Sequence, residues 1–179
     1  MLTGELTNLR AIDRDDFDRI IQWLDDPELM RWWGHGATVG STSALRTRIE
    51  DWIGQELASG HPTAFVVDDL DRQPIGLLIL SAIDPIDRSA ELSLFFLSQF
   101  RGRGYGADAL ETLCDAAFEQ WNLHRLTVRS EAHNLTAHKF FLQHGFEQEG
   151  RLREARFIDG EWRDILIFGR IRNKEPIDS

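Results

Sequence analysis

The stretch RGRGYG, residues 101–106, is the most informative local feature of this sequence. It follows an apolar run at 92–97 that predicts a strand, and it precedes residues 107–121, whose apolar positions recur every three or four residues as in a helix. Its glycines permit backbone conformations that a Cβ would forbid, and its two arginines add charged donors. Because a helix start presents unpaired backbone N–H groups and the positive end of the dipole, the stretch predicts a phosphate-binding loop.

Three other interpretations of this stretch are possible. A plain surface turn could carry two arginines without binding anything. A nucleotide-binding P-loop needs a lysine followed by serine or threonine, and Ala107 and Asp108 stand at those places. A dinucleotide-binding fingerprint needs a third glycine where residues 107–109 stand, and Glu131 is the nearest candidate for its acidic residue. The dinucleotide fold stays open as an alternative at this point.

Length and composition indicate an ordinary globular protein. The 179 residues are 42% apolar and 28% charged, and we expect one domain at residues 1–172 followed by a frayed tail at 173–179. No apolar run reaches the length of a membrane span, and no basic segment followed by an apolar stretch opens the chain. We therefore expect a cytoplasmic protein that does not bind membranes.

The net charge of −10 is uneven along the chain. Residues 1–90 hold 8 Lys and Arg against 16 Asp and Glu, whereas residues 91–179 hold 12 against 14. An acidic surface repels nucleic acid and attracts cations, so we expect no nucleic-acid partner and a cationic substrate. The alternative is that these acidic residues serve solubility alone.

Elsewhere, periodicity and turn signals predict alternating strands and helices. Four helices are expected. The first begins at Asp13 and ends before Pro27, and the second begins at Ser41 or Ser43 and reaches Leu57. The third covers 107–121 and the fourth covers 134–145. The expected strands lie at 6–12, 63–67, 74–83, 90–97 and 124–131, and two last strands form a hairpin whose turn is 158–161.

This order of elements resembles the GNAT superfamily of acetyl-CoA-dependent N-acetyltransferases, and more closely its branch of ribosomal-protein-alanine and spermidine-type acetyltransferases. The resemblance covers residues 6–171 and rests on two motifs. The first motif is arginine or glutamine, any two residues, glycine, any one residue, and then glycine or alanine. Arg101, Gly104 and Gly106 match it. Asn-x-x-Ala followed by an aromatic residue and Gly-Phe is met by Asn134, Ala137, Phe141, Gly145 and Phe146.

The resemblance implies an α+β fold in which a mixed, splayed central sheet is flanked by helices on both faces. The strands at 90–97 and 124–131 would part at the middle of the sheet and admit the pantetheine arm of acetyl-CoA, the co-substrate. Each of three cofactor-side residues has a structural alternative: Asn134 could be a helix cap, Arg103 could be exposed to solvent, and Tyr105 could pack against neighbouring side chains. The residues assigned to the cofactor are Phe96, Leu97, Arg101, Gly102, Arg103, Gly104, Tyr105, Gly106, Asn134 and Phe141.

Direct acetyl transfer needs a neutral amine, a polarised thioester carbonyl and a proton for the departing thiolate. Strand alternation puts Glu91 on the face opposite Leu92, and this branch tends to carry a glutamate there, so Glu91 is the expected catalytic base; the alternative is an exposed strand carboxylate. A backbone N–H near Leu97 is expected to polarise the carbonyl. Many members supply the proton from a tyrosine where this chain has Phe141, so we expect slower catalysis here.

The acceptor pocket is expected between the early helices and the last hairpin. Trp32, Trp33 and Glu28 are the candidate substrate-binding residues, because aromatic faces and a carboxylate hold cations; core packing or a homodimer contact is the alternative for the tryptophans. The histidines lack the spacing of a helical zinc pair, so we expect no metal. The single cysteine, Cys114, stands among apolar residues and is expected to be a buried thiol.

The sequence thus predicts an N-acetyltransferase that moves an acetyl group directly, in a ternary complex, to a small amine, a polyamine or a protein N-terminal α-amine. The alternative from another class is a CoA-binding sensor or scaffold domain with weak or lost catalysis, suggested by the phenylalanine at position 141.

Overall fold

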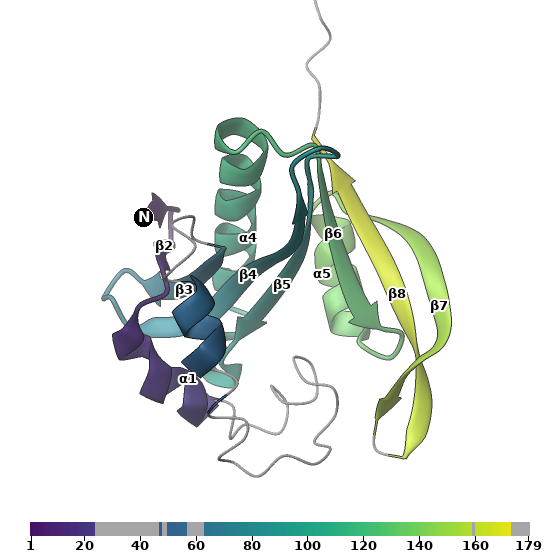
Figure 1. Ribbon diagram of the computed structural model, residues 1–179, viewed down its shortest axis with the longest axis horizontal. Coiled ribbons are helices and arrows are strands. Elements are labelled where there is room, and N and C mark those ends of the chain that lie inside the picture. The colour runs from purple at the N-terminus through teal and green to yellow at the C-terminus, as the bar shows by residue number, and fades with distance from the viewer. Residues whose placement is uncertain (24–46, 48–49, 57–62, 159, 173–179) are drawn as a thin grey trace, which may run out of the picture.

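The computed structural model describes residues 1–23, 47, 50–56, 63–158 and 160–172. Within them, eight strands form one mixed sheet in the order β1-β2-β3-β4-β5-β6-β8-β7 (Figure 1). The strands are β1 Leu2–Thr3, β2 Thr7–Ala11, β3 Ala64–Asp69, β4 Pro74–Asp84, β5 Ser89–Phe96, β6 Arg125–Glu131, β7 Glu147–Ile158 and β8 Glu161–Ile171. The helices are α1 Phe17–Trp23, a segment at 50–56, α4 Tyr105–Asp115 and α5 Leu135–Gln143, with short turns at Arg14–Asp16, Ser98–Phe100 and Ala116–Gln120.

The sheet is splayed between β5 and β6, as predicted. These strands form the parallel pair of the sheet and are bridged only at Ser89↔Arg125, Ala90↔Leu126 and Glu91↔Thr127. Beyond Glu91 the two strands diverge, which Figure 1 shows as a V open toward the bottom of the view. Each strand keeps its outer partner beyond that point, since β5 pairs with β4 to Phe96 and β6 pairs with β8 to Glu131. The inner edges of β5 and β6 are therefore left without a strand partner there.

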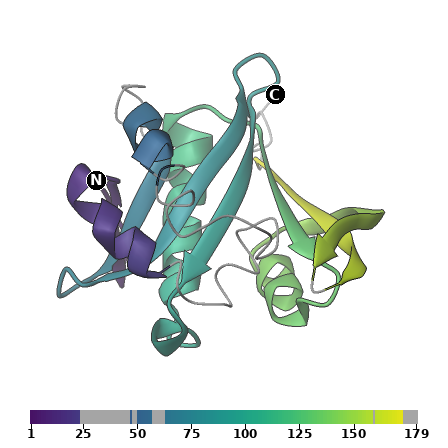
Figure 2. The same cartoon turned by 60° about the horizontal axis from the view of Figure 1, so that its bottom comes forward.

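Two clusters of apolar side chains cover the two faces of the sheet. The larger contains Leu92 and Phe96 of β5 and packs under α4 and α5. The smaller contains Ile20 of α1 and Ile53 of the 50–56 helix, and Phe95 packs against it. Alternation along β5 thus sends even-numbered side chains toward α4 and odd-numbered ones toward α1. Figure 2 shows α1 and the 50–56 helix lying across the sheet from α4.

The predicted strands and helices are found with shifted ends within the described residues. The helix expected at 107–121 begins two residues earlier, at Tyr105, and passes into a π-helical turn at Ala116–Gln120. Asp13 caps a short 3-10 turn, with a capping box to Asp16, and α1 follows it. β1 was not predicted, because two residues are too few to display a period. The ends of the two early helices and the tail at 173–179 lie outside the described residues.

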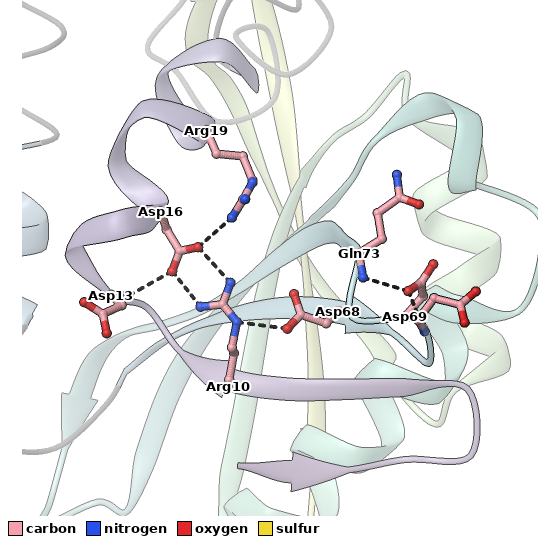
Figure 3. Close-up of polar contacts among 8 residues, drawn as sticks. Arg10, Asp13, Asp16, Arg19, Asp68, Asp69 and Gln73 are labelled. Carbon is pink, nitrogen blue, oxygen red and sulfur yellow. Dashed lines mark hydrogen bonds and ion pairs between the residues drawn. The ribbon is translucent and has the colours of Figure 1, made fainter.

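A cluster of ion pairs joins the start of α1 to the sheet (Figure 3). Arg10 on β2 donates from Nη1 and Nη2 to the Asp16 carboxylate at 2.6 and 2.7 Å, and from Nε to Asp68 on β3 at 2.9 Å. Asp16 also accepts from the Asp13 N–H and from Arg19. Burial alone would raise the pKa of Asp16, but the hydrogen bonds from Arg10 and Asp13 outweigh burial and lower that pKa.

Replacing Asp16 by asparagine should lower the free energy of unfolding by about 1 to 2 kcal/mol at pH 7, because charge-assisted hydrogen bonds to a partly exposed arginine are lost. A carboxylate whose pKa is lowered in the fold stabilises above the ordinary carboxyl pKa and loses that effect as the pH falls below about 4. Denaturant unfolding of wild type and Asp16→Asn at pH 7 and in acid measures both effects. Asp15→Asn, an exposed neighbour, is the control. Equal losses from both variants, or a pH-independent difference, would contradict this role.

Candidate cofactor cleft and active site

The loop at 101–106 is built to present backbone N–H groups. Gly102 and Gly104 have φ of +72° and +87°, and Gly104 is the residue that precedes α4. None of the N–H groups of residues 102–107 donates to an acceptor among the described residues. Residues 101–104 are exposed. A row of free N–H groups at the start of an eleven-residue helix is the arrangement that binds phosphate.

This loop lies at the mouth of the V between β5 and β6. A Cβ added at Gly106 would stand 3.7 Å from the Phe140 ring on α5 and 3.7 Å from the Phe96 ring on β5. Gly106 therefore lies where α4, α5 and the end of β5 meet. The spacing also leaves room for alanine at this position, which the family motif allows.

The two arginines of the loop fold back toward aromatic rings. Arg101 donates from Nε to the Phe96 carbonyl at 2.8 Å, and its guanidinium carbon lies 5.8 Å from the centre of the Phe95 ring. The guanidinium carbon of Arg103 lies 6.0 Å from the Phe100 ring, against which the Tyr105 ring also packs edge-on. Arg101 thus fixes the turn that leaves β5, and Tyr105 has the packing role that was its alternative.

The inner edge of β5 offers a second set of backbone groups. The N–H of Leu97 donates to the Ile75 carbonyl at 3.0 Å, on the β4 side. Because N–H groups alternate in direction along a strand, those of Leu94 and Phe96 point the other way, toward the gap. The Leu97 N–H itself is used by the Ile75 carbonyl, so the expected polarising N–H near Leu97 would be one of the neighbouring groups that face the gap, and this expectation stays a prediction.

Glu91 stands at the apex of the V, at the last bridged position between β5 and β6. It lies on the face opposite Leu92, as alternation predicted, and its side chain is 29% exposed. Its Oε2 lies 3.2 Å from Nε of Arg129 on β6. A carboxylate is thus held, partly solvated, where the inner edges of the two strands begin to part. Its role as a base stays a prediction.

Asn134 and Phe141 have clear structural roles in this geometry. The Asn134 side chain accepts from the Ala137 N–H at 3.1 Å and caps α5, which was its alternative role. Phe141 is 5% exposed, with its ring 5.4 Å from that of Phe146 in the core. The ring that lies near Gly106 is instead that of Phe140. Sequence reasoning missed Phe140, whose only signal was its place beside the motif position.

Cys114 cannot act as an accessible nucleophile. It is fully buried, and burial raises the pKa of its thiol to about 12. Among the described residues, no group of three or more His, Cys, Asp and Glu side chains is arranged to hold a metal ion. In that same part of the chain, no helix is long and apolar enough to cross a membrane. Trp32, Trp33 and Glu28 lie outside the described residues.

The described site fits a long ligand with a phosphate-rich end and an amide-bearing arm. The N–H groups of residues 102–107 suit the phosphates, the outward N–H groups of Leu94 and Phe96 suit the amides, and the gap leads to Glu91. The dinucleotide alternative is disfavoured, because that fold has a mostly parallel sheet, whereas the strand pairs here other than β5 with β6 are antiparallel.

Comparison with known proteins agrees with this geometry. The acetyltransferase (GNAT) domain family matches residues 7–147. Spermidine N(1)-acetyltransferase of Vibrio cholerae is 27% identical over 92% of this chain and 91% of its own length. The Escherichia coli K12 protein of that name is 24% identical over 93% and 86%. Ribosomal-protein-serine acetyltransferase of Escherichia coli K12 is 25% identical over 63% of this chain and 62% of its own.

Solved structures give the same result. A crystal structure of spermidine N-acetyltransferase from Vibrio cholerae in complex with CoA and spermine superimposes with a TM-score of 0.82 at 27% identity, covering 92% of this chain and 95% of that one. The α+β fold with a splayed mixed sheet is therefore confirmed, and acetyl-CoA is the co-substrate of this family. Together with the match over residues 7–147, this places the chain in the GNAT family as an N-acetyltransferase.

Proposed function

We propose that this protein moves the acetyl group of acetyl-CoA directly to a primary amine while both substrates are bound at the gap between β5 and β6. The observation that carries the proposal is the parting of these strands immediately after Glu91. It puts the Glu91 carboxylate at the narrow end of the gap. Backbone N–H groups of β5 face the gap, and the loop at 101–106, called the glycine loop below, lies at its open end. When bound, acetyl-CoA supplies the activated acetyl group.

The chain's own backbone would hold the co-substrate. The N–H groups of residues 102–107 donate to the diphosphate, and those of Leu94 and Phe96 pair with the arm as an added strand would. The N–H nearest the reacting carbonyl would stabilise the negative charge that develops on its oxygen. The family signature at Arg101, Gly104 and Gly106 supports this placement.

Glu91 would take the proton of the acceptor amine, directly or through one water. Deprotonating an amine with a pKa of about 10.4 costs roughly 4 to 5 kcal/mol at pH 7, whereas a peptide α-amine near 8 costs only about 1 to 1.5. The carboxylate is partly exposed, so water can reach it, and it forms an ion pair with Arg129. A base at this point contributes more to a polyamine acceptor than to an N-terminal one.

Direct transfer is supported by the state of the chain's one thiol. A covalent route needs an accessible nucleophile to carry the acetyl group, and Cys114 is buried with a raised pKa. The departing thiolate, with a pKa of about 8.5, tolerates release without a dedicated acid, so the phenylalanine at position 141 slows the reaction instead of preventing it.

A polyamine is the acceptor that we expect first. Its support is the likeness, over more than nine-tenths of this chain, to two proteins named spermidine N(1)-acetyltransferase, and the net charge of −10 favours a polycation. A protein N-terminal α-amine is the second candidate, supported by the likeness to ribosomal-protein-serine acetyltransferase over a shorter span.

The test is thiol release from acetyl-CoA by the purified chain with spermidine, spermine and N-terminal peptides, together with a CoA titration and mass analysis of the product. We expect turnover with at least one amine, an acetylated amine as product and no acetylated protein. CoA binding without turnover across the panel would favour the sensor alternative and contradict the proposal.

A further inference from the structure

The turn between β1 and β2 packs against the glycine loop, although nearly 100 residues separate them in the sequence. Leu6 touches the loop, since its Cδ1 would be 3.3 Å from a Cβ placed at Gly104. A Cβ at Gly4 would overlap the Asp108 carboxylate, so this position needs glycine for close approach. The Gly4 N–H donates to the Thr7 carbonyl at 2.8 Å and closes the turn.

Asp108 joins this N-terminal turn to the first turn of α4. Its Oδ2 accepts from the Thr7 hydroxyl at 2.5 Å, and its Oδ1 accepts from the Glu5 N–H at 2.8 Å. Thr7 is fully buried, so its hydroxyl does not exchange this partner for solvent. The Asp108 N–H donates to the Gly104 carbonyl at 3.0 Å, which is the first hydrogen bond of the helix. Both ends of Asp108 are therefore engaged, one with the loop and one with the turn.

The charge of Asp108 makes this arrangement matter for an anionic ligand. The positive end of the helix dipole stabilises a carboxylate in the first turn, and this carboxylate then competes with any other anion for the same site. The two hydrogen bonds direct the carboxylate toward the N-terminal turn and away from the exposed N–H groups of residues 102–107. Without them the carboxylate could rotate toward a bound diphosphate and repel it.

We propose that Asp108 is a positioning residue, which through Thr7 and the N-terminal turn fixes the first turn of α4 for the diphosphate of acetyl-CoA. The proposal rests on the proposed binding of that diphosphate by residues 102–107. It assigns to the segment at 4–7, which precedes every family motif in the chain, a role in co-substrate affinity.

The test compares Thr7→Val, which removes the hydroxyl and keeps the side-chain shape, with Thr7→Ser, which keeps the hydroxyl. Initial rates are measured with acetyl-CoA and with S-acetylpantetheine, which has the thioester and lacks the diphosphate. For Thr7→Val we expect KM for acetyl-CoA to rise about 3- to 5-fold with kcat unchanged, since one charge-assisted hydrogen bond is lost. Thr7→Ser should keep the wild-type KM, and kcat/KM with S-acetylpantetheine should not change in either variant.

Three results would overturn the proposal. They are an unchanged KM for acetyl-CoA in a folded Thr7→Val, equal losses with both donors, or equal losses in Thr7→Val and Thr7→Ser. Thermal melting of each variant shows that it is folded. Should Thr7→Val not fold, a CoA titration of Asp108→Asn, which weakens both anchoring hydrogen bonds, is expected to give a Kd raised about 3- to 5-fold, and an unchanged or lower Kd would overturn the proposal. A wild-type protein that fails to bind CoA would instead contradict the proposed function, so the two failures are distinguishable.

Discussion

Replacing Glu91 by glutamine should lower kcat/KM for a polyamine acceptor by about 100-fold at pH 7. Glutamine keeps the size and a hydrogen-bonding oxygen of the glutamate, but it cannot take a proton, and a general base contributes about 10² to 10⁴. Glu91 is partly exposed at the apex of the V, so substitution leaves no cavity in either core cluster. The expected loss is therefore catalytic, and affinity for CoA should hardly move.

The loss should depend on pH and on the acceptor. As the pH rises toward the pKa of the amine, the neutral amine becomes abundant without help, so the difference between wild type and Glu91→Gln should shrink. A peptide α-amine, with a pKa near 8, should show a smaller loss at pH 7 than a polyamine. Rate profiles from about pH 6.5 to 9.5 with both kinds of acceptor measure these trends.

Glu147→Gln is the matched control, because it makes the same change at an exposed glutamate of β7. It should leave kcat/KM within about 2-fold, since Glu147 lies three strands away from Glu91 in the sheet and an exposed charge contributes little. If Glu91→Gln behaved like this control at every pH, Glu91 would be the exposed strand carboxylate that was its alternative.

Replacing Gly104 by valine should raise KM for acetyl-CoA by about 10- to 30-fold. Gly104 has φ of +87°, where an L-residue costs about 1 to 2 kcal/mol and a β-branched one is a genuine outlier. A Cβ there would also press on Leu6 at 3.3 Å. The loop would relax away from the conformation that aims its N–H groups at one point. Because the diphosphate is bound throughout the reaction, kcat should change much less than KM.

Gly106→Ala is the matched control for the loop. Gly106 has no positive φ, and its nearest neighbours leave an ordinary contact of 3.7 Å for a methyl group. KM for acetyl-CoA should stay within about 3-fold of wild type. Equal effects at the two positions, or a Gly104→Val protein with unchanged KM, would show that the loop conformation does not govern CoA affinity.

Local patterns predicted the elements that frame the site. The apolar run of β5, the periodic apolar positions of α4 and the glycines between them each follow from side-chain spacing or backbone freedom. The splay of the sheet came from the family resemblance, since nothing within β5 or β6 shows that their pairing stops at Glu91. The pairing of β5 with β6 ends where β5 continues along β4 and β6 continues along β8, and that arrangement exists only in the folded sheet.

The side chains of the site were harder to predict. Whether Phe140 or Phe141 faces Gly106 depends on the rotation of α5 about its axis, and packing against Phe146 sets that rotation. The turn of Arg101 back to the Phe96 carbonyl and the pairing of Glu91 with Arg129 both join groups whose proximity only the folded sheet creates. Asp108 shows in the sequence only as a residue unsuited to a P-loop, and its contact with Thr7 spans 101 positions.

The most direct test of the central claim is a crystal structure of the protein with CoA. The account predicts diphosphate oxygens within about 3.2 Å of backbone nitrogens in residues 102–107, the pantetheine arm along the inner edge of β5, and the thiol near the apex of the V. CoA bound elsewhere, or a gap between β5 and β6 filled by side chains in the complex, would contradict it.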